Sequence, residues 1–162
     1  MDNKLTTCLW LDNEAEEMVS YYKSVFKDNF KEGDKTFYTS ETPSNKPIGS
    51  LLTYEFEIFD QSFMALNGGD NFKMNEAVSF VINCDTQEEV DYYWEALSAV
   101  PQAEVCGWCK DKFGVSWQIT PKRLNEMVKS EDKDAAGRAM EAMLKMGKID
   151  INSLEEAYKG GE

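Results

Sequence analysis

The segment 106–121, CGWCKDKFGVSWQITP, carries the residues whose types and spacing best suit ligand recognition. Its pattern predicts a β-hairpin, and the apolar Val115, Trp117 and Ile119 of the second strand alternate with the polar Ser116 and Gln118. An amide and a hydroxyl on one strand face can orient a small molecule by hydrogen bonds. The segment therefore predicts a binding surface that includes Gln118.

Small and polar residues also gather on one face of the other predicted strands, which leaves room there for a pocket. Bulky side chains such as Trp10, Phe80 and Trp117 occupy the opposite faces and suit packing beneath helices. The alternative is that a partner subunit or Trp108 fills this inner face. The predicted ligand-binding residues are Thr7, Phe63, Asn67, Trp108, Ser116 and Gln118.

The chain contains no histidine, the commonest general base at neutral pH, so the candidates for acid–base chemistry are the carboxylates in or beside the first hairpin. Glu57 reads as an exposed strand charge and Asp60 as a turn residue. If the strand face of Glu55 is the inner one, Glu55 is the sole ionisable group in the pocket and the candidate general base.

The four cysteines predict structural thiols. Cys106 and Cys109 have the CxxC spacing of a redox dithiol, but redox pairs take their low thiol pKa from a helix N-terminus, and these two lie on a predicted hairpin. A zinc site would need further ligands, and only Cys8 and Cys84, in other strands, remain. The sequence leaves a redox role open as the less favoured reading.

These residues are positioned by two similar runs of elements. The first run predicts a strand at 5–11, a helix with an Asn13–Glu16 capping box, one short strand at 35–39 in an otherwise irregular stretch, and a hairpin of 50–58 with 61–67. The second predicts a strand at 77–83, a helix with a capping box at 86–89, and a hairpin of 103–109 with 113–120. Because EEMVSYY at 16–22 is similar to EEVDYY at 88–93, the sequence predicts a duplicated β-α-β-β-β unit, followed by helices.

Four motifs, FMALNGGDNF, CDTQEEVDYYWEAL, CGWCKDKFGVSWQITP and KIDINSLEEAY, carry a family resemblance. The chain resembles the PhnB-like proteins, also called demethylubiquinone methyltransferase-like, of the vicinal oxygen chelate (glyoxalase/bleomycin resistance) superfamily. The resemblance implies an α+β fold of paired β-α-β-β-β modules that form a curved mixed sheet around a cavity, usually in a homodimer. We expect one domain over 1–162, with modules at about 1–70 and 75–121 and a helical tail at about 122–160.

The resemblance also implies four metal-ligand positions, which fall at Thr7, near Ala65, near Ala77 and at Gln118. Among these only Gln118 can ligate, and divalent ions need several carboxylate or imidazole ligands. We therefore expect a metal-free protein with no cofactor. No G-x-G-x-x-G fingerprint follows a predicted strand, so the sequence shows no site for a methyl donor either.

Charge and hydropathy exclude several partners. The net charge of −13 argues against nucleic-acid binding, which requires a basic surface. No window approaches the roughly 18 apolar residues of a membrane span, and the N-terminus lacks the apolar core of a secretory signal. We expect a cytoplasmic protein.

The sequence thus favours a protein that binds a small organic molecule in the sheet cavity. One alternative is a metal-dependent lyase, isomerase or dioxygenase of the same superfamily that recruits a metal through Gln118, Glu55 and unrecognised ligands. Another is a domain that acts through protein contacts, using its acidic surface and C-terminal helices.

Overall fold

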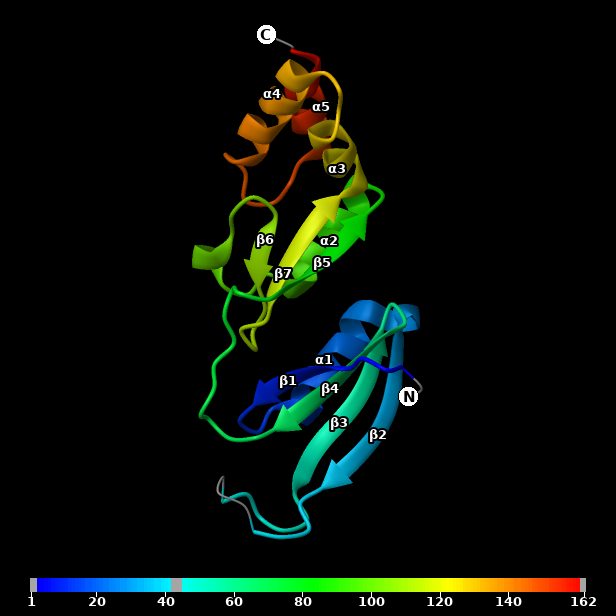
Figure 1. Ribbon diagram of the computed structural model, residues 1–162, viewed down its shortest axis with the longest axis vertical. Helices are drawn as coiled ribbons and strands as arrows, with labels where there is room; N and C mark the ends of the chain where they lie inside the picture. The colour runs from blue at the N-terminus through cyan, green and yellow to red at the C-terminus, as the bar shows by residue number, and fades with distance from the viewer. Residues whose placement is uncertain (1–2, 42–44, 161–162) are drawn as a thin grey trace. The chain divides into compact units, whose positions relative to one another are not determined.

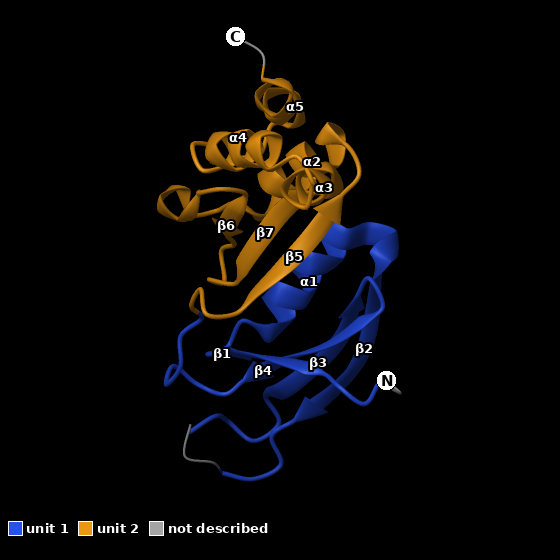
Figure 2. Cartoon of the chain, turned by 45° about the horizontal axis from the view of Figure 1, so that its top comes forward, with its two compact units in different colours: residues 1–74 blue, residues 75–162 orange. Residues whose placement is uncertain are grey.

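The computed structural model describes residues 3–41 and 45–160. The chain divides into two compact units, Met1–Met74 and Asn75–Glu162 (Figure 2). Within the described residues the first unit has a four-stranded sheet of order β1-β4-β3-β2, and the second a three-stranded sheet of order β5-β7-β6. Each sheet combines parallel and antiparallel pairs, and neither closes into a barrel. The predicted α+β class is confirmed.

The first unit follows the predicted β-α-β-β-β order (Figure 1). Its elements are β1 (Thr7–Leu11), α1 (Ala15–Phe26), the 3-10 turn η1 (Lys27–Asn29), β2 (Phe30–Phe37), β3 (Leu51–Ile58) and β4 (Gln61–Asn67). β1 runs parallel to β4, and the other neighbours are antiparallel. Phe59 and Asp60 join β3 to β4 with φ values of 50° and 60°, as a tight hairpin turn requires.

Helix α1 covers one face of this sheet with the apolar stripe that the sequence predicts. The Tyr22 ring lies 5.9 Å from that of Phe56, and Phe56 stacks on Phe63 at 5.3 Å. Met18, Tyr22 and Phe56 are fully buried. These aromatic contacts form the core of the first unit.

The first turn of α1 is not capped as predicted. Helix α1 begins at Ala15, after Glu14, and no side chain of the expected Asn13–Glu16 box closes the turn. Instead Oδ1 of Asn67, at the end of β4, accepts a hydrogen bond from the Ala15 N–H at 3.0 Å. The prediction was wrong because a residue distant in sequence satisfies the helix terminus.

Strand β2 is longer than the predicted strand at 35–39. It lies at the edge of the sheet, and all but one of its residues are exposed. Between Glu32 and Lys35 its register shifts, so that Gly33 and Asp34 together oppose Glu55 as a β-bulge. An exposed edge strand needs no alternation of apolar and polar residues. The charged sequence of β2 therefore resembles a loop, and the sequence predicted only a short strand there.

The second unit has one strand fewer than the predicted module. Its elements are β5 (Ser79–Cys84), α2 (Gln87–Leu97), the 3-10 turn η2 (Pro101–Ala103), β6 (Trp108–Lys110), β7 (Ser116–Pro121), α3 (Lys122–Val128), α4 (Lys133–Met143) and α5 (Ile151–Lys159). The described order is thus β-α-β-β, with β5 parallel to β7 and β6 antiparallel to it. The capping box of α2 is confirmed in part, because the Thr86 hydroxyl accepts from the Glu89 N–H at 3.3 Å while the Glu89 carboxylate accepts from Asp85 N.

The hairpin at β6 is shorter than predicted. The strand predicted at 103–109 begins only at Trp108, because the 3-10 turn η2 runs to Ala103 and Cys106 and Gly107 both have positive φ. A Cβ on Gly107 would lie 3.0 Å from the Ile119 carbonyl and 3.1 Å from the Ile149 side chain. The chain therefore needs glycine at this tight approach.

The predicted helical tail consists of α3, α4 and α5 (Figure 1), which contact one another and share a hydrophobic core. Its buried members are Leu124, Met127, Ala139, Ile149 and Leu154. The Gln87 carboxamide ties the tail to α2, because its Nε2 donates to the Ile149 carbonyl and its Oε1 accepts from the Ile151 N–H.

Candidate functional site

The strongest candidate site lies on one face of the β5-β7-β6 sheet. Helix α2 packs on the other face, where Ile82, Trp117 and Ile119 are buried. The face opposite α2 is here called the open face. The strand register places eight side chains on it, those of Ser79, Val81, Asn83, Trp108, Lys110, Ser116, Gln118 and Thr120.

Three of the predicted ligand-binding residues therefore share this open face. Trp108 pairs with Gln118 across β6 and β7, and Ser116 lies two residues from Gln118 on β7. Nε2 of Gln118 donates to the Ser79 hydroxyl at 2.9 Å. A carboxamide has a second N–H and a carbonyl oxygen besides this donor, so Gln118 can be held by Ser79 and still recognise a ligand.

Ser116 is the unusual member of the group. The residue is only 2% exposed, and its Oγ has no hydrogen-bond partner within the described residues. Leaving a buried hydroxyl unpaired costs about 1–3 kcal/mol, so such groups are rare and call for an explanation. A bound molecule or water at this position would remove the cost.

Lys110 adds a charge beside Ser116. It pairs with Ser116 in the register, and its ammonium group donates to the Glu76 carboxylate. This hydrogen bond lowers the pKa of Glu76. The Lys110 side chain is 20% exposed and that of Glu76 is 63% exposed. The lysine is therefore held against the sheet while its partner faces water.

The other three predicted binding residues lie in the first unit, on the face that α1 covers. Thr7 pairs with Phe63 and Leu11 pairs with Asn67, and Phe63 belongs to the aromatic core beneath the helix. The Asn67 amide is bonded on both sides, to Ala15 N and to the Leu51 carbonyl at 3.2 Å. The predicted assignment of faces is thus wrong in this unit and correct in the second.

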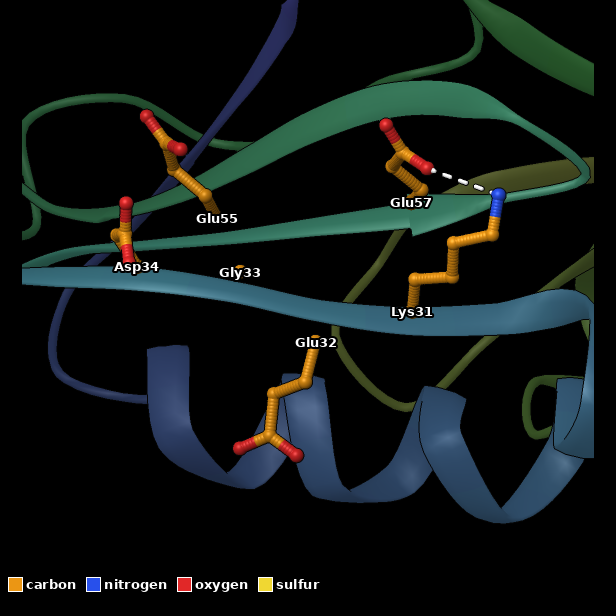
Figure 3. A pocket seen from close by; sticks show the side chains of 6 residues that line it. All are labelled: Lys31, Glu32, Gly33, Asp34, Glu55 and Glu57. Atoms are coloured by element: carbon orange, nitrogen blue, oxygen red, sulfur yellow. Dashed lines mark ion pairs between the residues drawn. The ribbon is translucent and has the colours of Figure 1, made fainter.

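Glu55 lies on the opposite face of the first unit's sheet, in a hollow of about 260 Å³. Figure 3 shows Glu55 and Asp34 on the same side of β2 and β3 as the ion pair of Lys31 with Glu57, while Glu32 points towards α1. Glu55 therefore has ionisable neighbours, contrary to the expectation of a sole carboxylate. Its role as a general base stays a prediction.

The cysteines are free thiols in the described structure. Burial, first of all, raises the pKa of Cys109 to about 12 and that of Cys84 to about 12. A redox thiol needs the opposite shift, because the thiolate is the reactive form. These pKa values favour the structural interpretation of Cys109.

No cluster of three or more Cys, Asp or Glu side chains in residues 3–41 and 45–160 is arranged to hold a metal ion. In the same residues, no helix has the length and apolar character to cross a membrane.

Two functional candidates and one structural residue escaped the sequence prediction. Lys110 could have been found from its period-two spacing with Trp108, whereas Glu76 lies before the strand and has no sequence signal. Asp111 is completely buried and accepts from Val115 N at 3.0 Å and from the Trp117 indole N–H at 2.9 Å. It stabilises the turn that sets the register of β6 and β7.

Fold and site together define an α+β protein with two mixed-sheet units, the second of which has polar side chains on its open face. Over residues 3–120 the chain matches the family described as 3-demethylubiquinone-9 3-methyltransferase, and so it belongs to this family of PhnB-like proteins. The match ends before α3, so the resemblance of the tail stays a prediction. None of the curated proteins matches the chain.

Two solved structures are similar to this chain. A PhnB protein from Bacillus cereus is 30% identical with a TM-score of 0.59, and the match covers 74% of this chain and 99% of that chain. A protein from Pseudomonas aeruginosa is 16% identical with a TM-score of 0.51, over 74% of this chain and 98% of that chain, which supports the fold alone. Both are covered almost completely, so the remaining quarter of this chain is an addition to the fold they share.

Proposed function

We propose that this PhnB-like protein binds a small organic molecule, without a metal ion, on the open face of the β5-β7-β6 sheet. The observation that carries the proposal is the buried, unpaired hydroxyl of Ser116 beside Gln118 and Trp108. Ser116 and Gln118 orient the ligand by hydrogen bonds, and the Trp108 ring supplies apolar contact. Phe63, Asn67 and Thr7 are left out, because they lie on the face that α1 covers.

The superfamily, the cellular location and the oligomeric state are part of the same proposal, which the sequence resemblance supports. We place the chain in the vicinal oxygen chelate superfamily, as a cytoplasmic homodimer. Methyl transfer is not part of the proposal, because the family's name alone suggests it and the sequence has no glycine-rich fingerprint after a strand. Sequestration of a ligand without turnover needs only the contacts described above.

The proposal is tested by a thermal-shift screen of small organic molecules, since a ligand that binds the folded state raises the melting temperature with its concentration. For each hit we expect weaker binding by Ser116→Ala and Gln118→Leu, by about 2–10-fold per lost hydrogen bond. The matched control is Gln102→Leu, the same exchange at an exposed residue of η2, which should leave affinity unchanged. Equal affinity in all three variants would remove this face from the site.

Manganese, nickel, zinc and magnesium are titrated in the same assay. We expect no concentration-dependent shift from any of them. A large shift with near-stoichiometric bound metal would instead favour the metal-dependent lyase, isomerase or dioxygenase.

A further inference from the structure

An ion pair starts from a residue that neighbours Ser116 on the second unit's sheet. Lys110 of β6 and Ser79 of β5 flank Ser116 of β7 on the open face. Lys110 contacts Glu76, which lies in the segment before β5. Ser116, the register partner of Lys110, is buried, and its Oγ has no hydrogen-bond partner in the described structure.

The two halves of this ion pair differ in how easily they can be replaced. The lysine side chain is 20% exposed and starts from a paired strand, whereas the glutamate side chain is 63% exposed and starts from the segment before β5. Exposed ion pairs contribute little to stability, because water solvates the separated charges well. The carboxylate can therefore leave while the lysine side chain stays on the open face, beside Ser116.

Resting on the binding function proposed above, we infer that the open face takes a small aromatic carboxylate, and that Glu76 occupies the position of the ligand's carboxylate in the free protein. In the complex the Lys110 ammonium and the Ser116 hydroxyl both donate to the incoming carboxylate. The aromatic ring then extends along β7 towards Gln118 and Trp108. Two strand residues span about 7 Å, which is close to the length of a benzoate ion.

The ligand's carboxylate replaces the Glu76 carboxylate at Lys110, and this exchange explains why the open face prefers an acid. Lys110 keeps a charged partner throughout, so its desolvation costs nothing more, and Ser116 gains the partner that it lacks. The exposed Val81, 49% accessible, gives the ring further apolar contact on the same face. A neutral ligand has no such reason to displace Glu76. Since the chain's net charge of −13 repels anions at long range, affinity depends on these local contacts.

The experiment is a calorimetric titration of the full chain with benzoate, and with benzamide as the neutral probe of the same shape. Glu76→Gln removes the internal competitor and should lower the dissociation constant for benzoate by about 2–5-fold. Lys110→Met should raise it by at least about tenfold and leave benzamide unaffected. The matched control is Asp85→Asn, which removes the Lys122–Asp85 ion pair at the other end of β5 and changes the net charge equally. It should leave the dissociation constant unchanged.

Three results would overturn the inference. Equal gains in Glu76→Gln and Asp85→Asn would show a general charge effect and no role for Glu76. Equal affinity for benzoate and benzamide, weakened in both cases by Ser116→Ala, would reject the acid class while leaving the binding face intact. No binding of benzoate to Glu76→Gln would also reject it. The binding function itself is judged by the broader screen, which does not depend on carboxylates.

Discussion

The two units place the same kind of strand pattern in opposite ways relative to their helices. In the first unit, α1 covers the face that carries Phe63 and Asn67, and both residues are buried. In the second unit, α2 covers the face of Trp117 and Ile119, and Gln118 remains on the open side. Two modules with similar element order therefore differ in which face is free to bind. The face that a helix leaves open, more than the presence of polar residues, decides where a ligand can sit.

Replacing Phe63 with alanine tests this comparison with the largest expected effect. The substitution removes an aromatic side chain that is 4% exposed and stacks on Phe56, so the free energy of unfolding should fall by about 3–5 kcal/mol. Urea denaturation measures the loss. Gln118→Leu, on the open face of the other unit, should change it by no more than about 0.5 kcal/mol. A stable Phe63→Ala protein with impaired ligand binding would contradict the assignment of faces.

Alkaline pH tests the burial of the face that α2 covers, because the thiols of Cys84 and Cys109 both lie on that face. Burial raises their pKa from 9.0 to about 12, so the unfolded chain releases these protons at a lower pH than the folded chain. Their contribution to stability is full below pH 9 and is lost as the pH rises towards 12. For two thiols the loss at pH 10 is about 2–3 kcal/mol.

The measurement is the free energy of unfolding from pH 7 to 10, compared between the natural chain and a variant with alanine at both positions. The variant should show a flatter pH dependence. The same slope in both proteins would mean that these thiols ionise in the folded protein as freely as in the unfolded chain.

Asn67→Ala has the smallest expected effect of the three. It leaves the Ala15 N–H and the Leu51 carbonyl without their side-chain partner, which should lower the free energy of unfolding by about 1–3 kcal/mol. Asn152→Ala, at an exposed position of α5, is the matched control and should be near neutral. If Asn67→Ala retains full stability, the amide would be free for ligand binding, as the sequence predicts.

Much of the fold follows from local sequence patterns. The stripe of α1, the Thr86–Glu89 capping box, the tight turn at Phe59 and Asp60, and the helical tail were all predicted. These features depend on residues close together in the chain, so a local pattern can specify them. Strand β2 was mostly missed, because its register comes from pairing with β3 and its own residues face water.

The candidate site was predicted only in part. The sequence predicted Ser116, Gln118 and Trp108. Polar residues alternate with apolar ones around Trp117, and this pattern assigns the polar residues to one face of the strand. Lys110 and Glu76 were not, because their contact joins a strand to a segment 34 residues earlier. The predicted capping residue Asn13 was replaced by Asn67 for the same reason, since that contact spans 52 residues.

By itself the sequence determined the α+β class, the repeated order of elements, the family and the two-faced character of the strands other than β2. Only the tertiary structure decided which face of each sheet the helix covers. Apolar and polar side chains alternate along a strand with a period of two, so the pattern sorts the residues into two faces. The pattern alone does not say which of the two faces a helix covers. The packing of each helix against its sheet makes that choice. It buries Asn67 under α1 and leaves Ser116 and Gln118 on the open face.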